Sequence, residues 1–335
     1  MRSKKYTDRE LCEIFSGKIK FICGKWFNQY NEEIKRIDSY LMRTGYFNTA
    51  NDVIKFKDTF IMAYGEFELD WPDLPIIEEA KHCELEPLCY PLNEKQLIII
   101  NYLLRHDEEI FFILTGVGGS GKSTFANIIR QVFDNDYAPL DLQQLSDPYT
   151  LATGVGRRLI CSDELNSKDL DNGTLKKIFS NQPITINPKF AKPYESRFQA
   201  AFFFNCNEPP KLDLTDTGMM RRILYYEMNE KIANPDPTLN RKVFSHKDLV
   251  NIVAHALKVD MTDWKSKFEK ETRDCLVKNN SVYLCREEYK YVFYADRCKL
   301  KGLKPFSEPN WQRVRSLLIE WGYINVQAEE NSLCK

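Results

Sequence analysis

Residues 111–124 read FFILTGVGGSGKST, an apolar run followed by a glycine-rich turn and a helix-compatible segment. The run predicts a buried strand, and the turn matches G-x-x-x-x-G-K-[ST] through Gly116, Gly121, Lys122 and Ser123. Glycines let backbone N–H groups close around phosphate oxygens, and a lysine at this position reaches the β- and γ-phosphates. We therefore expect a nucleoside triphosphate with Mg²⁺ here, held by Gly116, Val117, Gly118, Gly119, Ser120, Gly121, Lys122, Ser123 and Thr124.

The composition is that of an ordinary globular protein. The chain has 335 residues, of which 43% are hydrophobic and 28% charged, and its net charge is −1. No apolar run is long enough to cross a bilayer, and the N-terminus lacks the apolar segment of a signal peptide. The ten cysteines include no C-x-x-C pair, and His82, Cys83 and Cys89 do not have zinc-site spacing. We expect reduced thiols, a cytoplasmic location and no membrane partner.

The pattern predicts an α/β fold with three parts. Residues 1–92 carry three- and four-residue aromatic spacing that predicts a helical N-terminal domain of three or four helices, ending in a proline-rich strap over 69–93. Residues 93–232 alternate helices with apolar strands, which predicts a mostly parallel sheet covered on both faces. Residues 233–335 contain a helix at 246–258 and then a small C-terminal module.

The C-terminal module fits the outline of a winged helix. Residues 283–298 are helical in pattern, Ser307 can cap a second helix, and residues 323–326 fit a short strand. In a winged helix, Gln312, Arg313 and Arg315 would face outward toward DNA. A plain structural helix pair fits the same pattern.

Two polar groups follow the apolar strands of the central part. Asp163 and Glu164 follow the strand at 157–162, so they would emerge at the sheet edge that carries the phosphate loop. Ser123 and Asp163 would hold Mg²⁺, and Glu164 would polarise the attacking water. Asn207 follows the apolar run 200–205 and can position that water.

These motifs together resemble the superfamily 3 helicases, a branch of the AAA+ ATPases of small viruses, phages and plasmids. The resemblance covers about 110–228 through GVGGSGKST, LICSDEL, the hairpin-like stretch 184–199, FFFNCNEPP and GMMRRILYYEM. The last two, and residues 282–311 with the helix that follows, look like the phage and poxvirus-type primase-helicases. There is no room for the fused primase of that group, so the resemblance implies a separately encoded primase.

The resemblance also implies a role for each matching residue. Asn207 matches the polar sensor, and Arg222 matches the arginine finger that reaches a neighbouring subunit, with Arg221 as second candidate. The stretch 184–199 matches the DNA-tracking hairpin, with Lys189 as first DNA contact and Phe190 and Lys192 beside it. The resemblance implies an ATP-driven ring, a hexamer in the family's manner, that moves on single-stranded or forked DNA during replication of a mobile element. The N-terminal helices would be its collar.

Two alternatives stay open. An initiator or loader would close a ring on origin DNA without processive unwinding. A small-molecule kinase would also use a phosphate loop, but Asn207 and the Arg221–Arg222 pair would have no task in it.

Overall fold

The computed structural model describes residues 6–16, 18–22, 25–28, 34–64, 74–106, 108–162, 172–187, 193–198, 200–207, 217–233, 238–278 and 280–325. At its centre is a five-stranded sheet in the order β4-β5-β8-β3-β9, in which every described pairing is parallel. The strands are β3 (Phe111–Gly116), β4 (Tyr137–Ala138), β5 (Leu159–Ser162), β8 (Ala201–Asn205) and β9 (Ile223–Met228). The predicted α/β class with a parallel sheet is confirmed.

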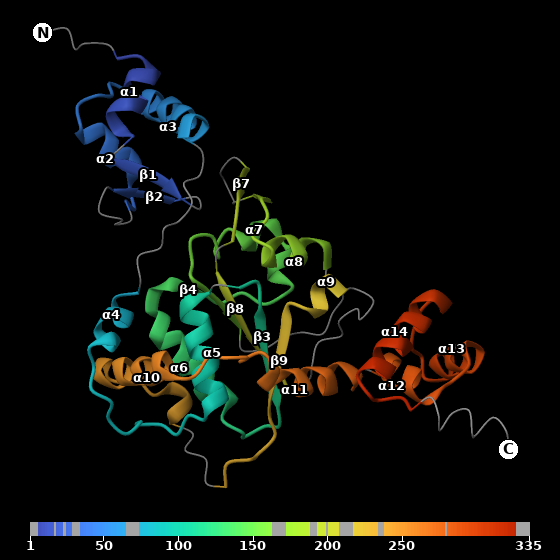
Figure 1. Cartoon of the computed structure of the whole chain (residues 1–335). Coiled ribbons are helices and arrows are strands. Elements are labelled where there is room, and N and C mark those ends of the chain that lie inside the picture. Colours follow the sequence, from blue (N-terminus) through green and yellow to red (C-terminus); the bar gives the residue numbers. More distant parts are fainter. Residues whose placement is uncertain are drawn as a thin grey trace, which may run out of the picture.

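Helices cover both faces of the sheet, and neighbouring residues of each strand point to opposite faces. Phe111 belongs to one apolar cluster and Phe112 to the other. The Phe112 side is covered by α5 (Glu94–Arg105), α6 (Lys122–Phe133), α10 (His246–Lys258) and α4 (Pro75–Lys81), which Figure 1 shows grouped beside the sheet. The Phe111 side receives α7 (Pro148–Leu151), α8 (Asn172–Phe179) and α9 (Thr217–Met220), and α11 (Ser266–Val277) packs against β9. Short 3₁₀ helices are η1 (Asp134–Asp136), η2 (Gln144–Ser146) and η3 (Leu239–Arg241).

The helix that precedes the phosphate loop begins where its cap predicts. The Asn93 side chain accepts from the backbone N–H of Gln96 at 3.0 Å, and the Gln96 side chain accepts from the Asn93 N–H at 2.9 Å. This reciprocal pair satisfies two donors that a helix start leaves open. Helix α5 then ends at Arg105, and His106 follows with a φ of 44°.

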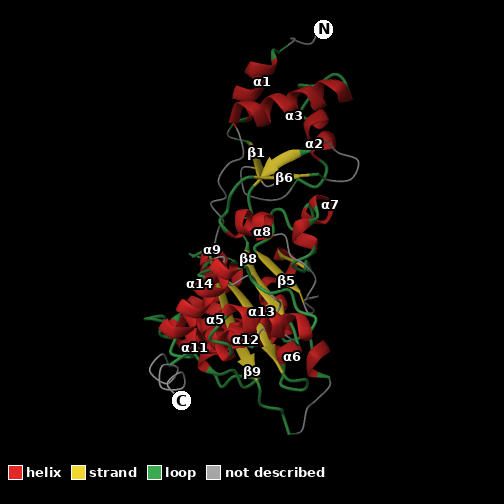
Figure 2. Ribbon diagram, turned by 90° about the vertical axis from the view of Figure 1, so that its right-hand side faces the viewer, coloured by secondary structure: helices red, strands yellow, loops and turns green. Residues whose placement is uncertain are grey.

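The N-terminal part is a separate cluster, drawn at one end of the molecule in Figure 2, and it is not all helical. It consists of α1 (Asp8–Phe15), β1 (Ile19–Ile22), β2 (Lys25–Asn28), α2 (Ile37–Arg43) and α3 (Ala50–Tyr64). The antiparallel pair β1–β2 replaces one of the expected helices. In the short segments IKFI and KWFN the side chains of Ile19, Phe21 and Trp26 enter the core from paired strands rather than from a helix.

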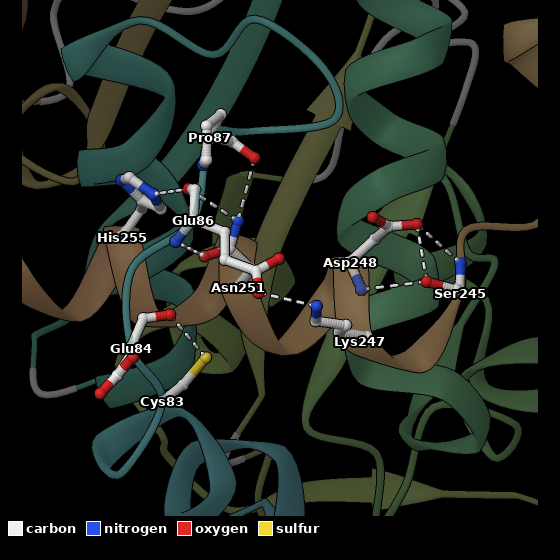
Figure 3. A network of polar contacts seen from close by, with 9 residues as sticks. All are labelled: Cys83, Glu84, Glu86, Pro87, Ser245, Lys247, Asp248, Asn251 and His255. Atoms are coloured by element: carbon white, nitrogen blue, oxygen red, sulfur yellow. Dashed lines mark hydrogen bonds and ion pairs between the residues drawn. The ribbon is translucent and has the colours of Figure 1, made fainter.

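The packing divides the chain differently from the expected boundaries at 92 and 232. Leu74, the helix α4 and Tyr90 belong to the core cluster of the sheet, and so do residues of α10 and α11. The strap between α4 and α5 is fastened to α10, as Figure 3 shows: Asn251 Oδ1 accepts from the Glu86 N–H, and Asn251 Nδ2 donates to the Glu86 carbonyl, both at 3.0 Å. His255 Nε2 lies 2.8 Å from the same carbonyl. The boundary expected at residue 92 rests on the prolines of the strap, and it separates Glu86 from the residues of α10 that Glu86 contacts.

Up to Asn325, where the described residues end, the C-terminal module has three helices, α12 (Asn280–Glu287), α13 (Tyr291–Leu300) and α14 (Glu308–Glu320). The helix expected over 283–298 is broken between α12 and α13, and residues 323–325 form irregular backbone rather than a strand. Arg315 does not face outward as expected. It is buried, and its Nη1 donates to the carbonyls of Cys285 and Glu288, both at 2.7 Å. Gln312 and Arg313 are exposed.

The expected hairpin at 184–199 is present as β6 (Ile184–Ile186) paired antiparallel with β7 (Tyr194–Ser196). Its turn, with Lys189, Phe190 and Lys192, lies outside the described residues. Across the described part of the chain, no helix has the length and apolar character that a membrane span requires.

Candidate functional site

The glycine-rich loop leaves β3 and enters α6 at Lys122, as its motif predicts. Three of its glycines have positive φ angles: Gly116 at 136°, Gly119 at 79° and Gly121 at 91°. At Gly116 the reason is also steric, because an added Cβ would lie 2.1 Å from the carbonyl oxygen of Met228 in β9. This glycine allows the loop strand and β9 to approach closely.

One side of the loop is packed and the other is open. An added Cβ at Gly121 would lie 3.0 Å from the Tyr90 hydroxyl oxygen and 3.2 Å from Ile232 Cδ1. At Gly118 and Gly119 it would meet nothing within 4 Å. The backbone around Gly118 is thus free to face a ligand, while the strap residue Tyr90 supports the loop from behind.

Lys122 lies inside the loop. Its side chain is buried, and its Nζ donates to the carbonyls of Gly116 and Val117, both at 2.8 Å. Burial lowers the pKa of the Lys122 ammonium below its ordinary value. The loop therefore holds a poorly hydrated cation at the start of a helix, the electrostatic environment that favours a phosphate anion.

The remaining loop residues have distinct surroundings. The Ser120 hydroxyl donates to the Val117 carbonyl at 2.9 Å, and Thr124 is buried. Ser123 is exposed in the first turn of α6, so its hydroxyl is accessible to a metal ion bound with a phosphate.

The carboxyl ends of β3, β5 and β8 lie at the same end of the sheet, where the phosphate loop leaves β3. Leu114 of β3 pairs with Asn205 of β8, and Phe204 of β8 pairs with Ser162 of β5. Asp163 and Glu164 follow Ser162 directly and lie outside the described residues. The strand order puts the last described residue of β5, Ser162, next to β8 and at the same end of the sheet as the loop.

The end of β8 holds a polar residue that the sequence analysis passed over. Asn205 is 3% exposed, and its Oδ1 has no hydrogen-bond partner among the described residues. Asn207, the expected sensor, is exposed just after the strand. The two-residue period of a strand would have flagged Asn205, because it follows Phe203 on the face of the sheet that α6 covers.

Between these two asparagines, Cys206 joins the end of β8 to β3, the strand that leads into the phosphate loop. Its backbone N–H donates to the Leu114 carbonyl at 2.9 Å, and burial raises the pKa of its thiol to about 12. The thiol is therefore neutral and does not compete with a phosphate for Lys122.

The two arginines expected to act between subunits differ in environment. Arg222 is buried: its Nε and Nη2 donate to Glu109 Oε2 at 2.9 and 2.6 Å, and its Nη1 donates to the Gly218 carbonyl at 2.7 Å. Arg221 is exposed and lines a pocket of ≈ 330 Å³ with residues of β9, α11 and Trp321. Both precede β9, at the end of the sheet opposite the loop, so neither can reach a phosphate bound to the same subunit's loop.

The part of the chain that contains the phosphate loop is similar to known proteins. Residues 114–222 match a family of unknown function, DUF5906. The match starts inside β3 and stops just before β9, so it spans the loop, the acidic pair, both asparagines and both arginines.

A protein of Acanthamoeba polyphaga mimivirus described as a "putative helicase" is 30% identical over 127 residues. The aligned part makes up 35% of this chain and 13% of the viral protein. This chain is thus similar to a small part of a viral protein of helicase type.

Two solved apo structures of the NrS-1 C-terminal region each cover 91% of this chain, with TM-scores of 0.47 and 0.45 and identities of 13% and 15%. The match covers 84% and 83% of those chains. Since both TM-scores are below 0.5, the fold class above rests on the strand order and pairing of this chain.

No group of three or more His, Cys, Asp or Glu side chains gathers as a metal site within the described ranges. Ser123 is the one described member of the expected Mg²⁺ pair, since Asp163 lies outside those ranges.

Proposed function

We propose that this protein is an ATP-dependent DNA helicase of the superfamily 3 type. The observation that carries the proposal is the open phosphate loop around buried Lys122, at the sheet edge where the strand leading to Asp163 and Glu164 also ends. The resemblance of the five motifs and the similarity to a viral protein of helicase type support the choice of helicase among phosphate-loop enzymes.

In this proposal each residue of the loop edge has one task. Lys122 leaves the carbonyls of Gly116 and Val117 to bind the β- and γ-phosphates, and Ser123 and Asp163 hold Mg²⁺. Glu164 polarises the attacking water, and Asn205 or Asn207 orients it.

The proposal requires an assembly, because the arginines lie at the far end of the sheet. A ring, with six subunits as the family resemblance implies, would bring the exposed Arg221 of one subunit to the phosphates of the next. Arg222 keeps its contacts with Glu109 and Gly218 and positions Arg221. We therefore assign the trans-acting role to Arg221, reversing the order expected from the motif.

The DNA is single-stranded or forked. It would pass the hairpin β6–β7, whose turn supplies Lys189, Phe190 and Lys192. Replication would also need a primase, supplied by a separate chain.

The test combines two measurements on the full chain. Mass in solution should shift to that of a hexamer with a non-hydrolysable ATP analogue, and a forked substrate should be unwound with ATP and Mg²⁺ but not by Lys122→Ala. A chain that stays monomeric and hydrolyses no ATP would overturn the proposal. ATP-dependent assembly on duplex origin DNA without strand displacement would replace it with the initiator.

A further inference from the structure

Helix α13 of the C-terminal module has an inner face and an unpartnered outer face. Tyr294 and Cys298 are buried, and the Tyr294 ring stacks on Phe306 with centroids 6.3 Å apart. On the other face Val292, Phe293 and Leu300 are 66%, 49% and 87% exposed. One exposed apolar residue is ordinary, but a group of them on one helix marks an interaction surface.

A second aromatic residue and a cation extend this face. Tyr289, which is 41% exposed, precedes α13, and its ring contacts that of Phe293 edge-on with centroids 6.2 Å apart. Lys290 Nζ lies 5.9 Å from the Tyr289 centroid and 6.0 Å from the Phe293 centroid. We call Tyr289, Lys290, Val292, Phe293 and Leu300 the α13 patch.

The surroundings of the patch are positive. Residues 289–304 contain five basic side chains and one acidic, whereas the net charge of the chain is −1. The nearby Glu287 and Glu288 are both paired with Arg297, and Asp296 is paired with Lys299. No described carboxylate pairs with Lys290, Lys301 or Lys304.

We propose that the α13 patch binds single-stranded DNA, with bases stacking on Tyr289 and Phe293 and a phosphate meeting Lys290. Exposed aromatic rings beside unpaired cations are the means by which proteins hold single strands without reading sequence. An apolar protein partner fits less well, because it would bury the Lys290 ammonium without a counter-charge. The choice of DNA rests on the proposed function.

This surface differs from the one that a winged helix would use. Arg315 of α14 is turned inward onto the carbonyls of Cys285 and Glu288, so α14 loses one of the three expected contacts. The patch lies on α13, at the outer edge of the molecule away from the sheet (Figure 1). A strand held there would be gripped at a second place besides the β6–β7 hairpin.

The test is fluorescence anisotropy of a labelled oligo(dT) with the full chain and no nucleotide. Tyr289→Ala combined with Phe293→Ala should weaken binding at least about tenfold, the scale of one or two lost stacking contacts. Phe293→Tyr should keep the affinity, and Phe293→Leu, which stays apolar but loses the ring, should reduce it. Tyr40→Ala removes an exposed tyrosine of the N-terminal part and is the matched control.

The role of the Lys290 charge is tested by measuring the affinity for the oligonucleotide at several salt concentrations. Lys290→Ala should lower the slope of log K against log salt by about 0.7, the value for one phosphate contact on a single strand. Unchanged binding by the double variant and by Phe293→Leu would overturn the proposal, and so would tighter binding of an equally long oligo(rU). The binding assay contains no nucleotide, so it tests the α13 patch even if the protein has no ATPase activity. If the patch does not bind DNA, the proposed ATPase activity is unaffected.

Discussion

Arg222 and Glu109 form an ion pair at the start of the central strands, in which two nitrogens of the guanidinium share the single oxygen Oε2 of the carboxylate. The neighbouring Arg221 has the opposite character, exposed at the rim of a pocket. Of these two consecutive arginines, one is therefore buried and holds the chain in place, and the other is exposed to solvent.

The first prediction separates these two roles. Arg222→Ala should lower the free energy of unfolding by about 2 kcal/mol, because it leaves Glu109 and the Gly218 carbonyl without their charged donor. Arg221→Ala should leave thermal unfolding unchanged and reduce ATPase activity about a thousandfold. Mixing Arg221→Ala with Lys122→Ala subunits should restore part of the activity. Mixed rings no more active than either mutant alone would contradict action between subunits.

The second prediction concerns nucleotide binding. Lys122→Ala should abolish binding of a fluorescent ATP analogue, because no other cation lies inside the described loop. Glu164→Gln should bind ATP but turn it over poorly, since a water-activating group acts only as the reaction proceeds. Lys258→Ala, at the exposed end of α10, is the control. Near-normal turnover by Glu164→Gln would place the base elsewhere.

The third prediction distinguishes the two asparagines. Asn205→Ala should keep the unfolding midpoint, because it removes a buried oxygen that lacks a partner, yet it should lower turnover roughly a hundredfold. Asn207→Ala tests the residue expected from the motif in the same assay. Normal turnover of Asn205→Ala with loss of activity in Asn207→Ala would restore the sensor to position 207.

The fourth prediction uses two loop glycines. Gly116→Ala should destabilise the protein, since its Cβ would lie 2.1 Å from the Met228 carbonyl oxygen and its φ is 136°. Gly118→Ala has open space and should fold normally, but its methyl group should weaken ATP binding by crowding the phosphates. Equal thermal stability of both variants would show that the loop and β9 can separate freely.

The fifth prediction concerns the hairpin. Lys189→Ala, alone and with Lys192→Ala, should bind ATP and assemble but lose unwinding, because a phosphate contact in the pore would be missing. Unwinding at the normal rate by the double variant would remove the hairpin from the DNA path without affecting the ATPase.

The sequence predicted the sheet and its phosphate loop because their signals are local. A buried parallel strand is a continuous apolar run, and the loop motif is contiguous, so FFILTG followed by GKST indicates both. The Asn93 cap of α5 was likewise readable from residues three positions apart.

What the sequence did not reveal depends on distant partners. Arg315 turns inward because carbonyls at Cys285 and Glu288 are available to it, and no spacing within α14 encodes them. The Arg222–Glu109 pair joins residues over a hundred positions apart, and so does the hydrogen bond between Glu86 of the strap and Asn251 of α10. The hairpin β1–β2 was missed because four-residue strands are too short for their period to outweigh a surrounding helical pattern.

The strap held by Asn251 has a consequence for how this molecule can be divided. Every hydrogen bond drawn between the strap and α10 involves residues after Leu74, so the sheet and its helices carry their own fastening. The N-terminal cluster has a separate core, which includes Phe15, Phe56 and Phe60. Among the described residues the two cores are separate, so replacing the N-terminal cluster with another would leave the packing of the sheet and its helices unchanged.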